Sequence, residues 1–139
     1  MSNQRKSISW ILDFTSKLPN AIEKVKCLKA NDIKPIRTVL QYALHPGIVW
    51  DLPAGDPPYT PCTEPYHENI LYQEARRLYI FIVNPQLNIP KSRKESMFIQ
   101  MLNDLDPEDA KLILAAKDKK LPYPGLTPLI IKQAYPGIL

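Results

Sequence analysis

Three lysines lie close together near the end of this sequence, between two segments that are predicted to be helical. Lys117, Lys119 and Lys120 follow an apolar helical pattern. Gly125 lies in the turn after them, and Thr127 precedes a proline at a position that predicts the next helix start. The first N–H groups of a helix have no partner within it, and the helix dipole is positive at that end. A turn that concentrates ammonium groups beside a helix start therefore predicts contact with phosphate.

Charge is distributed unevenly along the chain, which carries a net charge of +4. Residues 1–50 contain eight Lys and Arg against three Asp and Glu, residues 51–90 contain two against five, and residues 91–139 contain eight against six. If the two basic regions fold onto one face, that face attracts a polyanion. The pattern favours a nucleic-acid partner, with an ordinary solvated lysine surface as the alternative.

Residue types that perform catalysis or bind metals are sparse. Cys27 and Cys62 have no CxxC or histidine spacing around them, and His45 and His67 are 22 positions apart without a paired carboxylate motif. The chain has no GxGxxG, Walker or GxSxG sequence. We therefore expect no metal, no cofactor and no enzymatic activity.

The length of 139 residues predicts a single domain over residues 1–139, large enough to bury a core. Apolar runs end after five or six residues, as in Leu78 to Val83, so we expect no membrane-spanning segment. The N-terminus is polar and lacks the continuous apolar core of a signal peptide. These features predict a cytosolic protein.

Hydrophobic spacing predicts helices in the first third of the chain. Two short helices are expected before residue 30, and the second begins with the capping pair Asn20 and Glu23. A third helix can be capped by Asn31 or Asp32, and it ends near His45, which precedes a Pro-Gly pair.

The second half of the chain shows three more helix patterns before the lysine turn. A fourth helix is expected between Leu71 and Ile82, and the pair Ser92 and Glu95 predicts the start of a fifth. Asp106 before a proline predicts a sixth, whose apolar residues lie on more than one side. This sixth helix is expected to be the most buried element. The whole pattern predicts an all-α fold, a compact bundle of six to seven short helices.

Residues 46–66 form a long proline-rich segment without a hydrophobic period. Loops of this length are uncommon in compact domains unless they are functional or held against the surface. Trp50, Tyr59 and Tyr66 are the residues that can hold it there. Alternatively, the segment is apolar, rigid and acidic enough to bind another protein, through the same three aromatic residues.

The order of the predicted helices resembles the all-helical N-terminal DNA-binding domain of ATP-dependent DNA ligases, especially those of T-even bacteriophages. The matching residues are Ile11-Leu12-Asp13 and the helix up to Leu28 near the start, and the helix Asp109 to Lys117, the charged turn after it and Ala134-Tyr135-Pro136-Gly137-Ile138-Leu139 near the end. A second resemblance covers nearly the whole chain. Leu52-Pro53 through Pro58-Tyr59 and Leu71-Tyr72 to Arg76-Arg77-Leu78 are similar to a family of small uncharacterised proteins from T-even-like tailed phages.

The ligase resemblance implies a domain that holds the duplex backbone through helix ends and basic turns, largely without reading sequence. The positions in this chain that match such contacts are Lys117, Lys119, Lys120, Gly125 and Thr127, with Lys24, Lys34 and Arg37 on the N-terminal helices as further candidates. Ligation itself is not expected, because it needs a KxDG lysine in a separate domain and the chain ends where that domain would begin.

We therefore expect a non-catalytic bacteriophage accessory protein that binds double-stranded DNA without sequence preference, in the cytoplasm of the infected cell. The alternative is a protein-interaction module or virion component that binds a phage or host protein through the proline-rich segment. Because Lys117, Lys119 and Lys120 are expected to be exposed, replacing all three by Glu is expected to change the free energy of unfolding by no more than about 1 kcal/mol.

Overall fold

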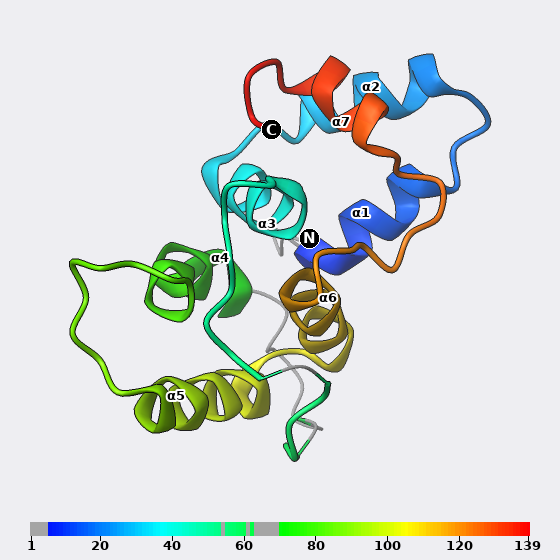
Figure 1. The fold of residues 1–139 in the computed structure, drawn as a ribbon. Helices are drawn as coiled ribbons and strands as arrows, with labels where there is room; N and C mark the ends of the chain where they lie inside the picture. The colour runs from blue at the N-terminus through cyan, green and yellow to red at the C-terminus, as the bar shows by residue number, and fades with distance from the viewer. Residues whose placement is uncertain (1–5, 54, 61, 63–69) are drawn as a thin grey trace.

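The computed structural model describes residues 6–53, 55–60, 62 and 70–139 (Figure 1). Within these residues the regular elements are helical, and no strand is present. The prediction of an all-α fold is confirmed. In chain order the elements are α1 (Ile8–Ser16), α2 (Ala21–Ala30), α3 (Lys34–Leu44), α4 (Ile70–Glu74), the 3-10 helix η1 (Ala75–Phe81), α5 (Lys91–Asp104), α6 (Pro107–Lys117) and α7 (Pro128–Ala134).

Polar side chains begin three of these helices where the sequence predicts them. The Asn20 side chain accepts a hydrogen bond from the backbone N–H of Glu23 at the start of α2. Asp106 caps α6, and Thr127 caps α7 through the N–H of Ile130. Each cap supplies an acceptor to an N–H group that lacks a partner in its own helix.

Two predicted helix starts are wrong. Ile33 takes the N-cap position of α3, so the helix has no side-chain cap. Of the two expected caps, Asn31 donates its side-chain hydrogen bond to the carbonyl oxygen of Cys27, and Asp32 binds the guanidinium of Arg37. Helix α5 follows Pro90, whose extended backbone takes the N-cap position two residues before the expected cap, Ser92. Ser92 therefore lies inside α5.

The fourth predicted helix is shorter than expected and changes character at Ala75. Five residues of α4 are α-helical, and the next seven form η1. The tighter winding of a 3-10 helix alters which side chains share a face. Ala75, Leu78, Ile80 and Phe81 are all buried in this element.

Helix α6 is the centre of the core, as predicted. It packs against α1 and α3 (Figure 1). Leu112 and Ile113 are fully buried, and α6 also buries Ala110, Leu114 and Ala116. Because its neighbours lie on several sides, apolar residues are needed around most of the helix.

Helices α2 and α7 lie side by side at one end of the molecule (Figure 1). The hydroxyl of Tyr135, just after α7, donates a hydrogen bond to the carbonyl oxygen of Leu28 in α2. Gln41 in α3 donates to the carbonyl oxygen of Ile138 at 3.1 Å. We call residues 20–37 and 127–139, which comprise α2, the first turn of α3 and α7, the α2–α7 lobe. None of the described helices is long and apolar enough to cross a membrane.

Candidate functional site

Lys117, the first lysine of the predicted phosphate-binding turn, is directed into the protein. Its side chain is only 3% exposed, and its ammonium group lies 3.0 Å from the carboxylate of Asp118. The same group donates a hydrogen bond of 3.1 Å to the carbonyl oxygen of Pro53. The Lys117 ammonium is therefore engaged within the fold.

Lys119 is held even more completely. Its ammonium group donates hydrogen bonds to the carbonyl oxygens of Tyr42 at 3.1 Å, His45 at 2.7 Å and Ile48 at 2.9 Å. These oxygens belong to the end of α3 and the turn after it, where carbonyl groups have no partner in the helix. Burial lowers the pKa of Lys119 below its usual value. Its backbone has φ of +62°, so the lysine also closes the turn after α6 in the left-handed region.

The predicted exposure of the lysine turn is thus wrong for Lys117 and Lys119, and right only for Lys120. The sequence places three lysines after an apolar helix. Their spacing does not indicate that two of the ammonium groups bind carbonyl groups far away in the sequence. The three ammonium groups therefore do not form a surface cluster, because only that of Lys120 faces water. Phosphate binding by this turn stays a prediction.

Gly125 and Thr127 have structural roles in the next turn. A Cβ atom at Gly125 would lie 2.1 Å from the carbonyl oxygen of Ser16, so only glycine allows this approach. Lys24 donates a hydrogen bond of 2.9 Å to the carbonyl oxygen of Gly125. Thr127 is exposed but uses its hydroxyl to cap α7, which has seven residues. These contacts dock the turn onto α1 and α2.

A third lysine, which the sequence analysis did not single out, is also buried. Lys94 in α5 is 3% exposed, and its ammonium group lies 2.9 Å from Asp51 and 3.3 Å from the carbonyl oxygen of Ile82. The hydrogen bond from Lys94 lowers the pKa of Asp51. Because Lys94, Lys117 and Lys119 all bind residues between His45 and Pro53, we call them the anchoring lysines.

The beginning of the proline-rich segment is held against the core, as the sequence predicts. Trp50 forms an isolated antiparallel bridge with Ile82, and its indole N–H donates a hydrogen bond of 2.9 Å to Tyr42. Trp50 is buried, and Tyr59 is partly buried against the core. Tyr66, the third aromatic residue predicted to hold the segment, lies outside the described residues. Trp50 is therefore a packing residue rather than an exposed contact for a partner.

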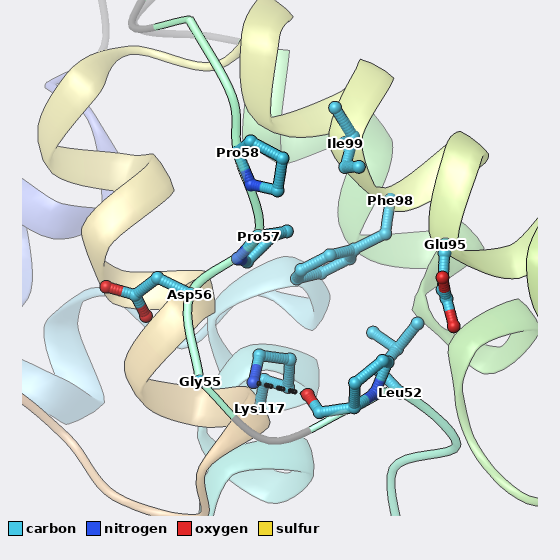
Figure 2. A pocket seen from close by; sticks show the side chains of 10 residues that line it. Leu52, Gly55, Asp56, Pro57, Pro58, Glu95, Phe98, Ile99 and Lys117 are labelled. Carbon is cyan, nitrogen blue, oxygen red and sulfur yellow. Dashed lines mark hydrogen bonds between the residues drawn. The ribbon is translucent and has the colours of Figure 1, made fainter.

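An apolar pocket of about 250 Å³ lies between this segment and α5. Figure 2 shows the ring of Phe98 reaching from α5 toward Pro57, whereas the carboxylate of Asp56 points away from the pocket. Lys117 belongs to the lining through its alkyl chain and its bond to Pro53. The lining consists of Leu52, Pro53, Gly55, Asp56, Pro57, Pro58, Glu95, Phe98, Ile99 and Lys117.

Lys24, Lys34 and Arg37, the remaining predicted contacts, all lie in the α2–α7 lobe. Arg37 pairs with Asp32 and also lies 4.8 Å from the centre of the Tyr135 ring. The Asp32 carboxylate raises the pKa of Arg37, and Arg37 lowers that of Asp32. Lys24 is partly buried, whereas Lys34 is exposed.

Positive charge is concentrated in the α2–α7 lobe. The lobe contains six Lys and Arg against two Asp and Glu, a balance of +4 that equals the net charge of the whole chain. Four of its lysines are exposed and form no ion pair with the described residues. They are Lys26, Lys29, Lys34 and Lys132.

No group of three or more His, Cys, Asp and Glu that could hold a metal ion occurs in the part of the chain that the structure describes. His45 accepts a hydrogen bond of 2.9 Å from the N–H of Gly47, which orients its ring locally. Cys27 contacts the hydroxyl of Thr15 at 3.0 Å. His67 lies outside the described residues.

Comparison with known proteins identifies a family but no characterised relative. A family model described as a family of unknown function, DUF6433, matches residues 11–123. No curated protein and no solved structure matches the chain. Since the family model covers most of the sequence, the protein belongs to this family of unknown function.

Proposed function

We propose that the protein is a non-catalytic nucleic-acid-binding module that contacts the phosphate backbone through the α2–α7 lobe, without sequence preference. The observation that carries this proposal is the concentration of charge, because the lobe holds the entire net charge of +4 and the remainder of the chain is neutral in sum. The resemblance of the sequence to the N-terminal DNA-binding domain of ATP-dependent DNA ligases points to the same kind of partner.

The exposed lysines have the chemistry that this function needs. Each ammonium group that approaches a phosphate releases condensed counterions, so affinity rises with the number of contacts and falls with salt. Lys26, Lys29, Lys34 and Lys132 have no competing carboxylate partner among the described residues. Lysine is a flexible point charge, suited to a backbone that presents the same phosphate whatever the base.

The proposed contact thus lies in the lobe instead of the lysine turn, and the lobe includes three of the residues predicted from the sequence, Lys24, Lys34 and Arg37. The N-terminus of α7 is not part of the proposed contact, since Thr127 already caps that helix. In keeping with the resemblance to proteins of T-even-like phages, we expect the module to act on DNA in the cytoplasm of an infected cell.

Fluorescence anisotropy with labelled duplex DNA, measured across a salt series, tests the proposal. Contact by about four lysines predicts that log K falls with log salt with a slope of about −3 to −4. The variant Lys26→Glu/Lys29→Glu is expected to abolish duplex binding. A matched control, Arg76→Glu/Arg93→Glu, reverses two exposed charges outside the lobe and is expected to bind with much of the original affinity.

Equal loss of binding in the two double variants would show that only net charge matters, and would remove the lobe as a specific surface. No binding of the unaltered protein at low salt would refute the proposed function. Circular dichroism of both variants checks that their helices are intact, because all four positions are exposed and should tolerate substitution.

The pocket beneath the proline-rich segment supports a second candidate function, in which the protein binds a phage or host protein. Its lining is largely apolar, and its volume of about 250 Å³ exceeds the roughly 150 Å³ that holds a benzene ring in an engineered cavity. One apolar side chain of a partner would therefore fit. Ile99→Glu should weaken such an interaction, whereas the neighbouring exposed change Gln100→Glu should not, and binding through the pocket should respond little to salt.

A further inference from the structure

Two aromatic side chains on α1 lie at the surface with their rings stacked on each other. Trp10 is 47% exposed and Phe14 is 48% exposed. Their ring centres are 5.2 Å apart, and the ring planes differ by 9°. Large aromatic residues usually supply buried contact area, so a stacked pair that remains half exposed offers flat apolar surface to another ring.

The pair borders a hollow of about 400 Å³ between α1 and the end of α2. Ala30 and Asn31 contribute to this hollow from the last turn of α2, and Ile33 contributes from the residue before α3. The hollow is therefore continuous with the α2–α7 lobe. It has room for a planar ring, because about 150 Å³ is sufficient for benzene.

Positive charge accompanies the aromatic pair on this side. The ammonium group of Lys6 lies over the Trp10 ring, 5.1 Å from its centre, so a base that stacks on this face of the indole takes the place of the ammonium group. Lys34 follows Ile33 directly in the sequence, and Lys26 lies one helical turn before Ala30 on α2. Both lysines are exposed. A ligand in the hollow would thus meet flat rings at its centre and cations around it.

The opposite side of Trp10 carries the other sign of charge. There the indole borders a second hollow, whose lining is acidic in sum because it contains Asp13, Asp106 and Glu108 against one cation, Lys111, which pairs with Glu108. These carboxylates would repel phosphate groups. A polyanion that reaches Trp10 is therefore directed along the α2 side, toward the lobe.

We propose that α1 and the end of α2 form a stacking platform for single-stranded nucleic acid, in which Trp10 and Phe14 receive bases while Lys6 and the lysines of the lobe contact phosphates. The inference rests on the proposed function and extends it, because it specifies the form of nucleic acid. Every base has a flat face, so stacking tolerates any sequence. In a duplex those faces are already stacked, and the platform adds nothing to duplex binding.

The fluorescence of Trp10 provides a direct test, since a base stacked on an exposed indole changes its emission. The probes are an oligothymidylate of about a dozen nucleotides and a strand of the same length whose internal sugars lack bases. The two strands present the same phosphates. The oligothymidylate is expected to bind at least roughly tenfold more tightly and to quench the tryptophan emission.

Variants assign the signal to the aromatic pair. Trp10→Ala and Phe14→Ala are each expected to weaken oligothymidylate binding by roughly tenfold and to change duplex binding by less than about twofold. Trp10→Phe keeps a ring and should keep most of the affinity, while it removes the quenching. The buried Trp50 remains in every variant as an internal reference.

The outcomes separate this inference from the proposed function. Equal affinity for the two strands, or unchanged Trp10 emission at saturation, would overturn the stacking platform and leave phosphate binding by the lobe intact. Failure of every strand and duplex to bind at low salt would overturn both. If an amphipathic peptide instead quenches Trp10 without a salt dependence, the patch is a protein-docking surface and the stacking platform is refuted.

Discussion

Lysine has opposite roles in two regions of this molecule. Around residues 45–53, the anchoring lysines Lys94, Lys117 and Lys119 place their ammonium groups on backbone carbonyls and carboxylates. In the α2–α7 lobe, four lysines extend into water without an ion pair among the described residues. The difference shows that a lysine cluster in a sequence does not define a basic surface. What decides is whether unpaired acceptors lie within reach of each ammonium group.

The geometry of helix ends explains the contrast. The last carbonyls of α3 and the turn after it point toward the end of α6, where Lys119 can reach three of them. Cations are also favoured near the negative end of a helix dipole. In α2, the carbonyl oxygen of Leu28 is satisfied by the hydroxyl of Tyr135, so no lysine is required there. The lobe's lysines therefore remain available for a ligand.

Among single substitutions, the largest expected effect follows from Lys119→Met, which keeps the alkyl chain and removes the charge. The carbonyls of His45 and Ile48 lose a charge-assisted partner, so we expect the free energy of unfolding to fall by about 2–4 kcal/mol. Denaturant unfolding measures this, with Lys120→Met as an exposed control expected to change stability by less than about 0.5 kcal/mol. Similar small losses in both variants would mean that Lys119 does not anchor the segment.

This expectation reverses the one drawn for the triple change to Glu at 117, 119 and 120. With two of the three ammonium groups engaged in the fold, that variant is expected to lose at least as much stability as Lys119→Met, well above the earlier limit of about 1 kcal/mol. Loss of DNA binding by the triple variant would therefore not identify a phosphate site, because the protein would be partly unfolded. Single substitutions separate the two explanations.

A smaller effect is expected for Asp51→Asn, which removes the charged partner of Lys94. Breaking a pair with one buried member should cost about 1–3 kcal/mol, at the lower end because Asp51 is partly exposed. The Lys94 hydrogen bond lowers the pKa of Asp51 from its ordinary value of 3.8. The stabilisation is therefore complete above that value and is lost as the pH falls through the lowered pKa.

Urea unfolding of the two proteins between pH 7 and pH 2 tests this dependence. The difference in unfolding free energy between the original protein and Asp51→Asn should be constant near neutrality and should shrink only in strong acid. A difference that stays constant down to pH 2 would show that the amide change acts through packing and not through charge.

The parts of the fold that sequence reasoning predicts correctly depend on signals close together in the chain. Asn20, Asp106 and Thr127 each accept a hydrogen bond from a residue two or three positions later, so the pattern and the contact coincide. The burial of α6 is also visible, because its apolar residues cover more than one side. All-α architecture follows from such local signals.

The features that sequence reasoning misses depend on partners far along the chain. The acceptors of Lys119 lie 71 to 77 positions before it, and Lys94 pairs across 43 positions. No local pattern distinguishes these lysines from Lys26 or Lys29. Of the four exposed lysines of the lobe, sequence reasoning therefore named Lys34 and missed Lys26, Lys29 and Lys132. The division into anchoring and exposed lysines required the three-dimensional packing.

Tyr135→Phe tests the lobe, where a tyrosine hydroxyl, and not a lysine ammonium group, donates to a carbonyl oxygen near a helix end. Loss of the hydrogen bond to Leu28 should reduce the free energy of unfolding by about 1 kcal/mol. Burial raises the pKa of Tyr135 above its ordinary value of 10.0, so its stabilisation is complete below pH 10 and declines above it, where the unfolded chain ionises. Unfolding measured at pH 7 and pH 11 should show the variant and the original protein converging at the higher pH.

The smallest expected effect belongs to Lys120→Glu, which separates the lysine turn from the lobe as the place of nucleic-acid contact. Lys120 is the exposed cation of the turn and forms no ion pair with the described residues, so stability should change by less than about 0.5 kcal/mol. If phosphate binds at the lobe, duplex affinity should fall by no more than about twofold, through long-range charge alone. A loss as large as that of Lys26→Glu/Lys29→Glu, in a protein of unchanged stability, would return the contact to the turn. The anchoring of Lys117 and Lys119 would then hold the turn in the position that exposes Lys120 to the ligand. Both the lysine turn and the lobe would offer cations to phosphate, and they would differ only in how the fold positions those cations.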